Sequence, residues 1–123
     1  RNNNIFYTEI CFSEKEYQAA AEVIWKRLQS ENFVTYIKNF RLRAKEEQKI
    51  IVIIDEDDYH LIDYYIRVFF KFFSGISLAD AYYYALCIDK VGYCPIYMSN
   101  NETDINSIVN FMKNNFLEVR IEQ

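Results

Sequence analysis

One stretch decides the fold: Ile50-Ile51-Val52-Ile53-Ile54, followed directly by Asp55-Glu56-Asp57-Asp58. Five β-branched residues in a row predict a buried strand, because branched side chains pack well on a pleated surface. Four carboxylates then end the strand abruptly. Taken alone, they predict a solvated acidic turn that caps a following helix, since negative charge is favourable at a helix N-terminus.

After this strand, helical and extended patterns alternate. Residues 61–73 have the length of a helix and no breaker, and Gly75 can adopt the positive φ that ends it. Ser77 is the expected N-cap of the next helix, with Asp80 three residues later. The remaining elements are a strand at 93–98, where Pro95 indicates a sheet edge or a strand end, and a helix at 102–114. A half-exposed strand follows at 117–122, where the inward-facing Leu117, Val119 and Ile121 alternate with charged residues. The order β-α-α-β-α-β predicts an α/β (α+β) fold, with one small sheet and helices packed on a face.

Residues 1–48 are predicted to form a mostly helical N-terminal extension ahead of a core domain at 49–123. Ser13 and Glu16 match a capping box, and apolar residues at helical spacing place a helix at 14–29, with Trp25 in the core. Three other segments are expected here: a short strand or extended segment at 5–12, a second helical stretch at 33–40, and a solvated, charged linker at 41–48.

Length and composition exclude several classes of protein. A chain of 123 residues is long enough for one domain. Its 2 glycines exclude Gly-rich phosphate-binding loops, and its net charge of −4 argues against a nucleic-acid partner. No run of about 18 apolar residues occurs, so we expect no membrane span. The odd count of 3 cysteines indicates a reducing compartment, and no cofactor is expected.

Two motifs resemble those of the ClpS family, over about residues 49–122. They are Asp55-Glu56-Asp57-Asp58-Tyr59 after the apolar strand, and Val68-Phe69-Phe70-Lys71-Phe72-Phe73 at the end of the next helix. ClpS proteins have an apolar strand, an Asn-Asp-Asp-Tyr turn and a helix ending in Lys-Phe-Phe at matching spacing. They are adaptors, not enzymes, and they deliver N-degron substrates to a Clp AAA+ unfoldase and its protease.

The resemblance implies an amine-binding site at the end of the strand. In the family, an Asn, an Asp and a His on the second helix hold the α-amine of the substrate's first residue. The matching positions here are Glu56, Asp58 and Asp89, with Asp57 beside them. Because an α-amine has a pKa of about 7.7–8.0, it is largely cationic at neutral pH. Carboxylates are strong partners for it, so we expect stronger charge selection than in the family's Asn-Asp-His site.

The resemblance also implies an apolar pocket for the first side chain and a surface for the unfoldase. The matching pocket positions are Ile62, Tyr65, Ala85, Ile88 and Leu117. A lysine that the family uses against its unfoldase aligns with Asp104, so the expected interface includes Glu102 and Asp104. The implied partners are N-degron peptides and a ClpA- or ClpC-like unfoldase, which the family's N-terminal extension also engages.

Two other interpretations stay open. The first is a ClpS-fold interaction module that no longer recognises N-termini, since Glu56, Asp89 and Asp104 replace family residues. The second is a divalent-metal protein. Five hard ligands fall within one short span: Asp55, Asp57, Asp58, His60 and Asp63. Outside the metal interpretation, we expect His60 to be a surface residue near the helix cap and not a catalytic base.

The expected location follows from the resemblance and the composition. ClpS-like proteins work in the bacterial cytoplasm or in plastid stroma. The chain starts at Arg1 rather than Met, and its residue usage is typical of an AT-rich genome. These features favour the stroma of a plastid-like organelle of the apicoplast type, with the bacterial cytoplasm as the alternative.

Overall fold

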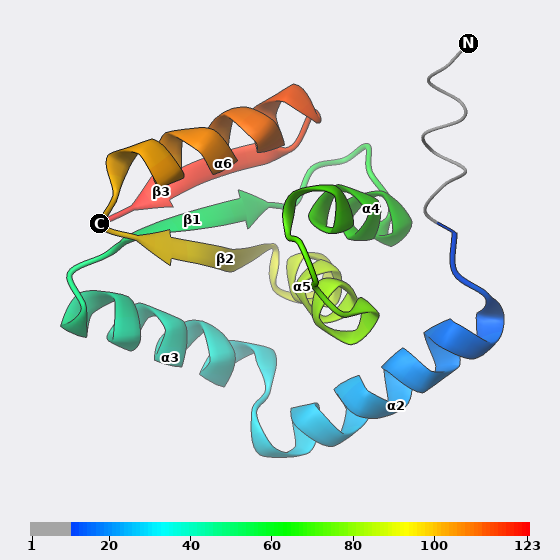
Figure 1. Cartoon of the computed structure of the whole chain (residues 1–123). Helices are drawn as coiled ribbons and strands as arrows, with labels where there is room; N and C mark the ends of the chain where they lie inside the picture. The colour runs from blue at the N-terminus through cyan, green and yellow to red at the C-terminus, as the bar shows by residue number, and fades with distance from the viewer. Residues whose placement is uncertain (1–10) are drawn as a thin grey trace, which may run out of the picture.

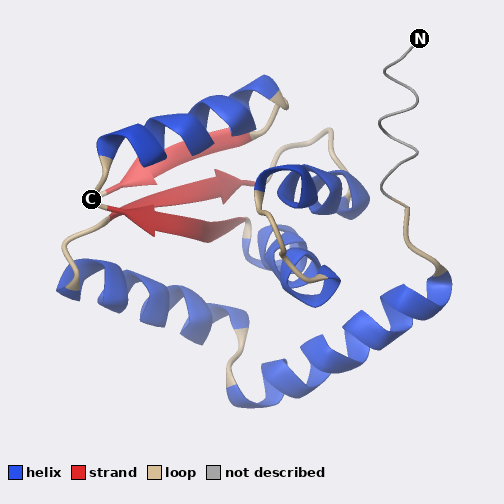
Figure 2. Cartoon of the chain, viewed as in Figure 1, coloured by secondary structure: helices blue, strands red, loops and turns tan. Residues whose placement is uncertain are grey.

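Helices surround a small antiparallel sheet in this chain (Figures 1 and 2). The computed structural model describes residues 11–123. In chain order the elements are α2 (Glu14–Ser30), α3 (Phe33–Glu46), β1 (Ile50–Asp55), α4 (Ile62–Phe72), α5 (Leu78–Val91), β2 (Tyr93–Ser99), α6 (Glu102–Asn114) and β3 (Glu118–Glu122). From β1 onward this is the predicted β-α-α-β-α-β order, and the α+β fold class is confirmed. Residues 5–10 of the expected N-terminal extended segment lie outside the described part of the chain.

β1 is the central strand of the sheet, since β2 and β3 pair with its two edges. Both pairings are antiparallel. Pro95 lies on the edge strand β2, as predicted. Between Val52 and Ile53 the register shifts, so that Ile96 is the extra residue opposite β1. Proline has no N–H to donate and is therefore tolerated at an edge beside a bulge.

The core fills both sides of β1. Ile51, Val52, Ile53 and Ile54 are all buried, each with at most 4% of its surface exposed. Because successive side chains of a strand point to opposite faces, both faces of β1 must be covered. α3 and α6 lie on opposite sides of the strands (Figure 1), and α5 packs against β2.

Helix α3 is longer than predicted, and the prediction of a linker at residues 41–48 is wrong. The helix continues through most of that segment, and Ala44 is 2% exposed. Phe40 and Ala44 are four residues apart and share a face, so the charged residues between them project from the other faces. The turn into β1 is tight: Gln48 has a positive φ of 54°, and the Lys49 N–H donates to the Ala44 carbonyl at 2.9 Å.

The two front helices share one hydrophobic core with the rest of the fold. Ile24 of α2 and Tyr36 of α3 belong to the same buried cluster as β1. The Tyr36 hydroxyl donates to the Pro95 carbonyl at 2.8 Å. Arg41 donates twice to the Glu122 carboxylate of β3, at 2.7 and 2.9 Å. The described part of residues 1–48 is therefore packed onto the core domain.

Two apolar side chains predicted to face inward are exposed. Trp25 is 66% exposed. The buried stripe of α2 runs through Ala20 and Ile24, and the next residue lies about 100° around the helix. Ile121 is 47% exposed, whereas Val119 packs against the core. β3 is an edge strand, so the alternation does not bury every second residue.

The capping signals of α2 and α5 are confirmed. Ser13 and Glu16 form the reciprocal capping box of α2. The Ser77 hydroxyl accepts from the Asp80 N–H at 3.0 Å, and Gly75 has a φ of 79°. These short-range devices fix where the helices begin and end, because they satisfy N–H groups that have no partner within the helix.

The acidic turn expected to cap the next helix does not cap α4. The N-cap of α4 is Leu61, without a side-chain hydrogen bond, because Asp57 accepts from the N–H groups of Tyr59 and His60 instead.

Replacing Phe40 with Ala tests whether α3 belongs to the core. Phe40 is 8% exposed, so truncation leaves a cavity and we expect a loss of about 3–5 kcal/mol in the free energy of unfolding. Urea denaturation of the full chain measures it. The matched control is Leu42→Ala on the same helix, because Leu42 is 51% exposed and such a change costs about 0.5 kcal/mol or less. Equal losses in the two variants would contradict the described packing.

Candidate functional site

A cleft of about 340 Å³ opens where β1 ends, between the N-terminal end of α4 and the C-terminal end of α5. Its size falls within the range of small-ligand pockets. The lining residues are Glu56, His60, Leu61, Ile62, Asp63, Tyr65, Ile88 and Asp89. The cleft therefore combines an apolar lining with several carboxylates.

One backbone hydrogen bond brings the two sides of the cleft together. The Glu56 N–H donates to the Gly92 carbonyl at 2.9 Å. Gly92 ends α5 in the left-handed conformation, with a φ of 102°, and its N–H donates to the Ile88 carbonyl. Only glycine adopts this conformation without strain. As a result Asp89, on the last turn of α5, lies in the same cleft as Glu56 at the end of β1.

The structure brings three of the five predicted pocket residues into the cleft. Ile62, Tyr65 and Ile88 line it. Ala85 and Leu117 lie outside the lining and are buried in the hydrophobic core, at 0% and 4% exposure. Tyr65 and Ile88 belong to the same core, at 3% and 0% exposure, and only their edges border the cleft. The apolar part of the cleft is therefore shallower than the predicted set implies.

The four predicted amine ligands divide into two pairs. Glu56 and Asp89 both line the cleft and are exposed to solvent. Asp58 is exposed but is not among the lining residues. Asp57 also lies outside the lining, and its side chain is only 6% exposed. Two carboxylates thus remain in position to meet a cation in the cleft.

Asp57 and His60 form a hydrogen-bonded pair that sequence reasoning missed. The Asp57 carboxylate lies 2.7 Å from His60 Nδ1 and accepts from the backbone N–H groups of Tyr59 and His60 at 2.9 and 2.8 Å. The His60 ring stacks on Tyr64, with centroids 4.1 Å apart. His60 is thus held in one orientation at the cleft wall, with 18% of its side chain exposed. The Asp-x-x-His spacing was the only signal in the sequence for this turn.

This turn shifts the pKa of two groups. Burial opposes ionisation of Asp57, but the hydrogen bonds from the His60 side chain and from the backbone of His60 and Tyr59 outweigh it and lower the pKa of the carboxyl. Tyr65 accepts from the Asp57 N–H at 3.3 Å through its hydroxyl oxygen. Burial is the main cause that raises the pKa of Tyr65 to about 12. The turn therefore carries an ionised Asp57 against a neutral Tyr65 at neutral pH.

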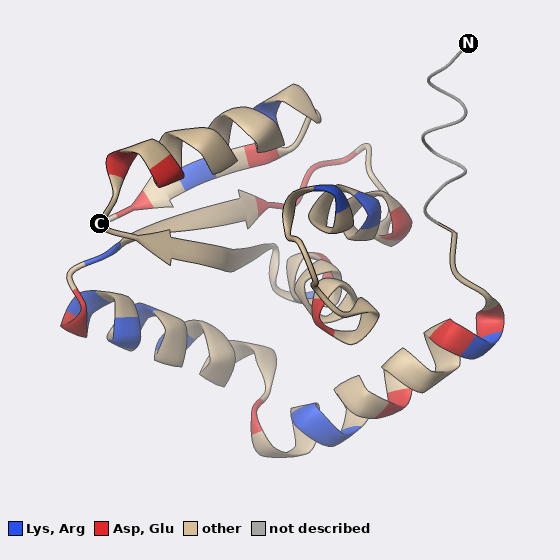
Figure 3. Ribbon diagram, in the orientation of Figure 1, with Lys and Arg blue, Asp and Glu red and all other residues tan. Residues whose placement is uncertain are grey.

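Negative charge dominates the cleft. Glu56, Asp63 and Asp89 all line it, and acidic residues cluster along the loop after β1 (Figure 3). Asp63 accepts from the Tyr17 hydroxyl of α2 at 3.0 Å. Lys90 lies 3.9 Å from Asp89 in an exposed ion pair, which contributes little because water screens it. The arrangement favours a cationic ligand.

The predicted unfoldase residues lie at the other end of the sheet. Glu102 and Asp104 are exposed in the first turn of α6. Asp104 accepts from the Ser99 hydroxyl at 3.4 Å, and Ser99 pairs with Ile50 at the start of β1. The cleft is at the opposite end of that strand, so Glu102 and Asp104 form no part of it.

The divalent-metal interpretation is not supported. Among residues 11–123, no group of three or more His, Cys, Asp or Glu side chains is placed to hold a metal ion. The hard ligands after β1 diverge: Asp55 accepts from Arg120 Nε at 2.8 Å, Asp57 holds His60, and Asp63 holds Tyr17. Apart from the Asp57–His60 pair, these side chains therefore do not converge on one point.

None of the helices in the described part of the chain has both the length and the apolar character needed to cross a membrane. No protein-family model matches the chain, and no curated protein matches it either.

Replacing Asp57 with Asn tests the turn. The lowered pKa means that ionised Asp57 stabilises the fold above the carboxyl's unfolded pKa, and that this stability is lost as pH falls through the folded value. We expect Asp57→Asn to lower the free energy of unfolding by about 1–2 kcal/mol near neutral pH. The difference from the unmodified chain should narrow below about pH 4, near the ordinary pKa of aspartate.

Urea denaturation at neutral and acidic pH measures this difference. The control is Asp58→Asn, because Asp58 is exposed and accepts no hydrogen bond from the described residues. The loss of stability in Asp57→Asn should depend on pH and should be absent from Asp58→Asn. If the loss stays constant with pH, or if Asp58→Asn shows the same loss, the ionised Asp57 carboxylate does not stabilise the turn.

Proposed function

We propose that this chain is an adaptor of ClpS type, which binds the free N-terminal residue of a substrate and presents it to a Clp AAA+ unfoldase of ClpA or ClpC type. The observation that carries the proposal is the cleft that Glu56 and Asp89 both line. The ClpS resemblance assigns these two positions to the binding of the substrate's α-amine. The order of elements after residue 49 supports the same interpretation.

The chemistry of the cleft fits a cationic amine beside an apolar side chain. An α-ammonium group that leaves water needs charged acceptors, and Glu56 and Asp89 supply two. Ile62, Tyr65 and Ile88 give the adjoining apolar surface. Binding and handover need no bond to be made or broken, so the proposed role is non-enzymatic. Its proposed location is the stroma of a plastid-like organelle, with the bacterial cytoplasm as the alternative.

One observation favours a second candidate, a ClpS-like interaction module that does not read N-termini. Asp58, the position at which the family's Asp is kept, lies outside the cleft lining. Carboxylates stand where the family has Asn and His, and without a cation they repel each other. The two candidates differ in one property, the dependence of peptide binding on a free amine.

Fluorescence anisotropy with labelled peptides that begin with Phe, Tyr, Trp, Leu or Ala tests the proposal, each peptide being measured free and N-acetylated. We expect the bulky apolar first residues to bind best, and acetylation to weaken binding at least about tenfold, or about 1.4 kcal/mol. Glu56→Gln and Asp89→Asn should each produce a loss of similar size. Glu22→Gln, an exposed change on α2, should leave binding unchanged.

Binding that survives acetylation would contradict recognition of the amine. Failure of every peptide to bind would favour the interaction module.

A further inference from the structure

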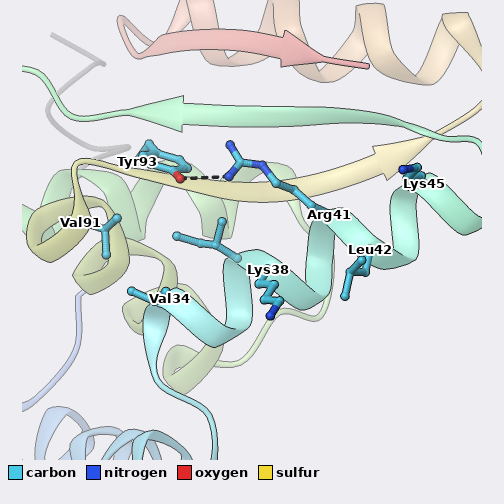
Figure 4. Close-up of a pocket in the computed structure, with 8 residues that line it drawn as sticks. Val34, Lys38, Arg41, Leu42, Lys45, Val91 and Tyr93 are labelled. Atoms are coloured by element: carbon cyan, nitrogen blue, oxygen red, sulfur yellow. Dashed lines mark hydrogen bonds between the residues drawn. The ribbon is translucent and has the colours of Figure 1, made fainter.

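A groove runs along α3 on a surface that shares no lining residue with the cleft. It has a volume of about 360 Å³. α3 supplies most of the lining, and Val91 and Tyr93 complete it from the end of α5 and the start of β2 (Figure 4). The residues from α3 are Val34, Ile37, Lys38, Arg41, Leu42 and Lys45. They recur at helical spacing, so one face of the helix forms one wall.

The apolar part of the groove is open to solvent. Val34 is 68% exposed and Leu42 is 51% exposed. Val34 of α3 and Val91 of α5 lie on facing walls (Figure 4). Exposed aliphatic side chains lining a hollow are typical of a surface that a partner covers.

The charge of the groove is opposite to that of the chain. Its lining residues all lie in the described part of the chain and include three cations, Lys38, Arg41 and Lys45, but no carboxylate. The whole chain has a net charge of −4. Glu122, which lines the adjoining hollow and not this groove, neutralises Arg41 through two hydrogen bonds, and the Tyr93 hydroxyl accepts a third at 3.2 Å. Lys38 and Lys45 form no ion pair with residues 11–123 and are available to a partner.

A second hollow extends the groove past the end of α3. It has a volume of about 580 Å³ and shares Arg41 and Lys45 with the first. It adds the cation of Lys49, which is 2.8 Å from Glu47, and the carboxylate of Glu122, which is already paired with Arg41. Val34 to Lys45 spans about 16 Å of helix at 1.5 Å per residue. An extended peptide covers that length with about five residues.

We propose that this groove binds a short acidic segment of a partner protein, in which aliphatic residues alternate with Asp or Glu. The aliphatic side chains pack beside Val34, Leu42 and Val91, and the carboxylates pair with Lys38 and Lys45. This surface goes beyond the proposed adaptor function and does not depend on it, because no groove residue lines the cleft.

Fluorescence anisotropy of the full chain with a labelled peptide of alternating Glu and Leu, about six residues long, tests the groove. The peptide is N-acetylated, so it has no free α-amine and amine-dependent binding in the cleft does not contribute to the signal. We expect it to bind, and to bind less tightly as salt rises above an ionic strength of about 0.15 M. Peptides with Gln for Glu, or with Ser for Leu, should bind at least about tenfold more weakly.

Matched variants locate the binding. Lys38→Glu with Lys45→Glu should abolish it, and Leu42→Ser should weaken it at least about tenfold. Lys15→Glu with Lys113→Glu makes the same change in net charge on exposed residues of α2 and α6, and should leave binding within about twofold. Thermal unfolding of each variant confirms that the exposed changes leave the fold intact.

Three results would overturn the proposal. The first is failure of the Glu and Leu peptide to bind, and the second is an equal loss in the two double variants. The third comes from sedimentation of the chain alone. If the chain sediments as a dimer, and the Lys38→Glu, Lys45→Glu double variant sediments as a monomer, the groove is occupied by a second copy of the chain and not by a partner peptide.

Discussion

Burial of β1 on both faces is the constraint on which the rest of the structure depends. Four successive residues, Ile51 to Ile54, are almost wholly removed from water, and each burial of such a side chain contributes about 1.5–3 kcal/mol. A three-stranded sheet with helices on one face alone would leave two of them exposed. The additional cover comes from α3, which packs against β1 and β2, and Arg41 of this helix reaches across to β3.

The same strand explains where the candidate site forms. A strand buried on both faces must leave the core at its end, and polar residues follow as soon as it does. Glu56 stays within reach of α5 because its N–H is bonded to the Gly92 carbonyl. Asp57 turns back to hold His60. The cleft is thus the place where an apolar strand, a helix start and a helix end meet.

Sequence reasoning succeeded where the controlling interaction is local. The β-branched run of β1, the capping box at Ser13 and the Ser77 cap each depend on neighbours within a few residues, and the elements they define are confirmed. It failed where the outcome depends on distant partners. The dense charge of residues 41–48 predicts a linker, although Ala44 is buried in the hydrophobic core.

The candidate site departs from this division. The cleft residues Glu56 and Asp89 are more than thirty positions apart in the sequence, and only the family resemblance pairs them. Asp57 and His60 are three residues apart, yet Asp57 was grouped with its acidic neighbours. The orientation of a carboxylate in a turn depends on which backbone N–H groups point toward it. The amino-acid composition of the turn does not show where those N–H groups point. Only the family resemblance places Ala85 and Leu117 in the pocket, and in the structure both are buried in the hydrophobic core.

The cleft and the groove have opposite charges and meet at one junction. Asp89 lines the cleft, Val91 and Tyr93 line the groove, and Gly92 between them is bonded to Glu56. Charges beyond about 8 Å are largely screened at physiological salt, so each surface selects its ligand by nearby groups and not by the net charge of −4. The two proposed ligands would have opposite charges, an acidic peptide in the groove and an amine in the cleft. The short, glycine-capped end of α5 would carry any influence of one on the other.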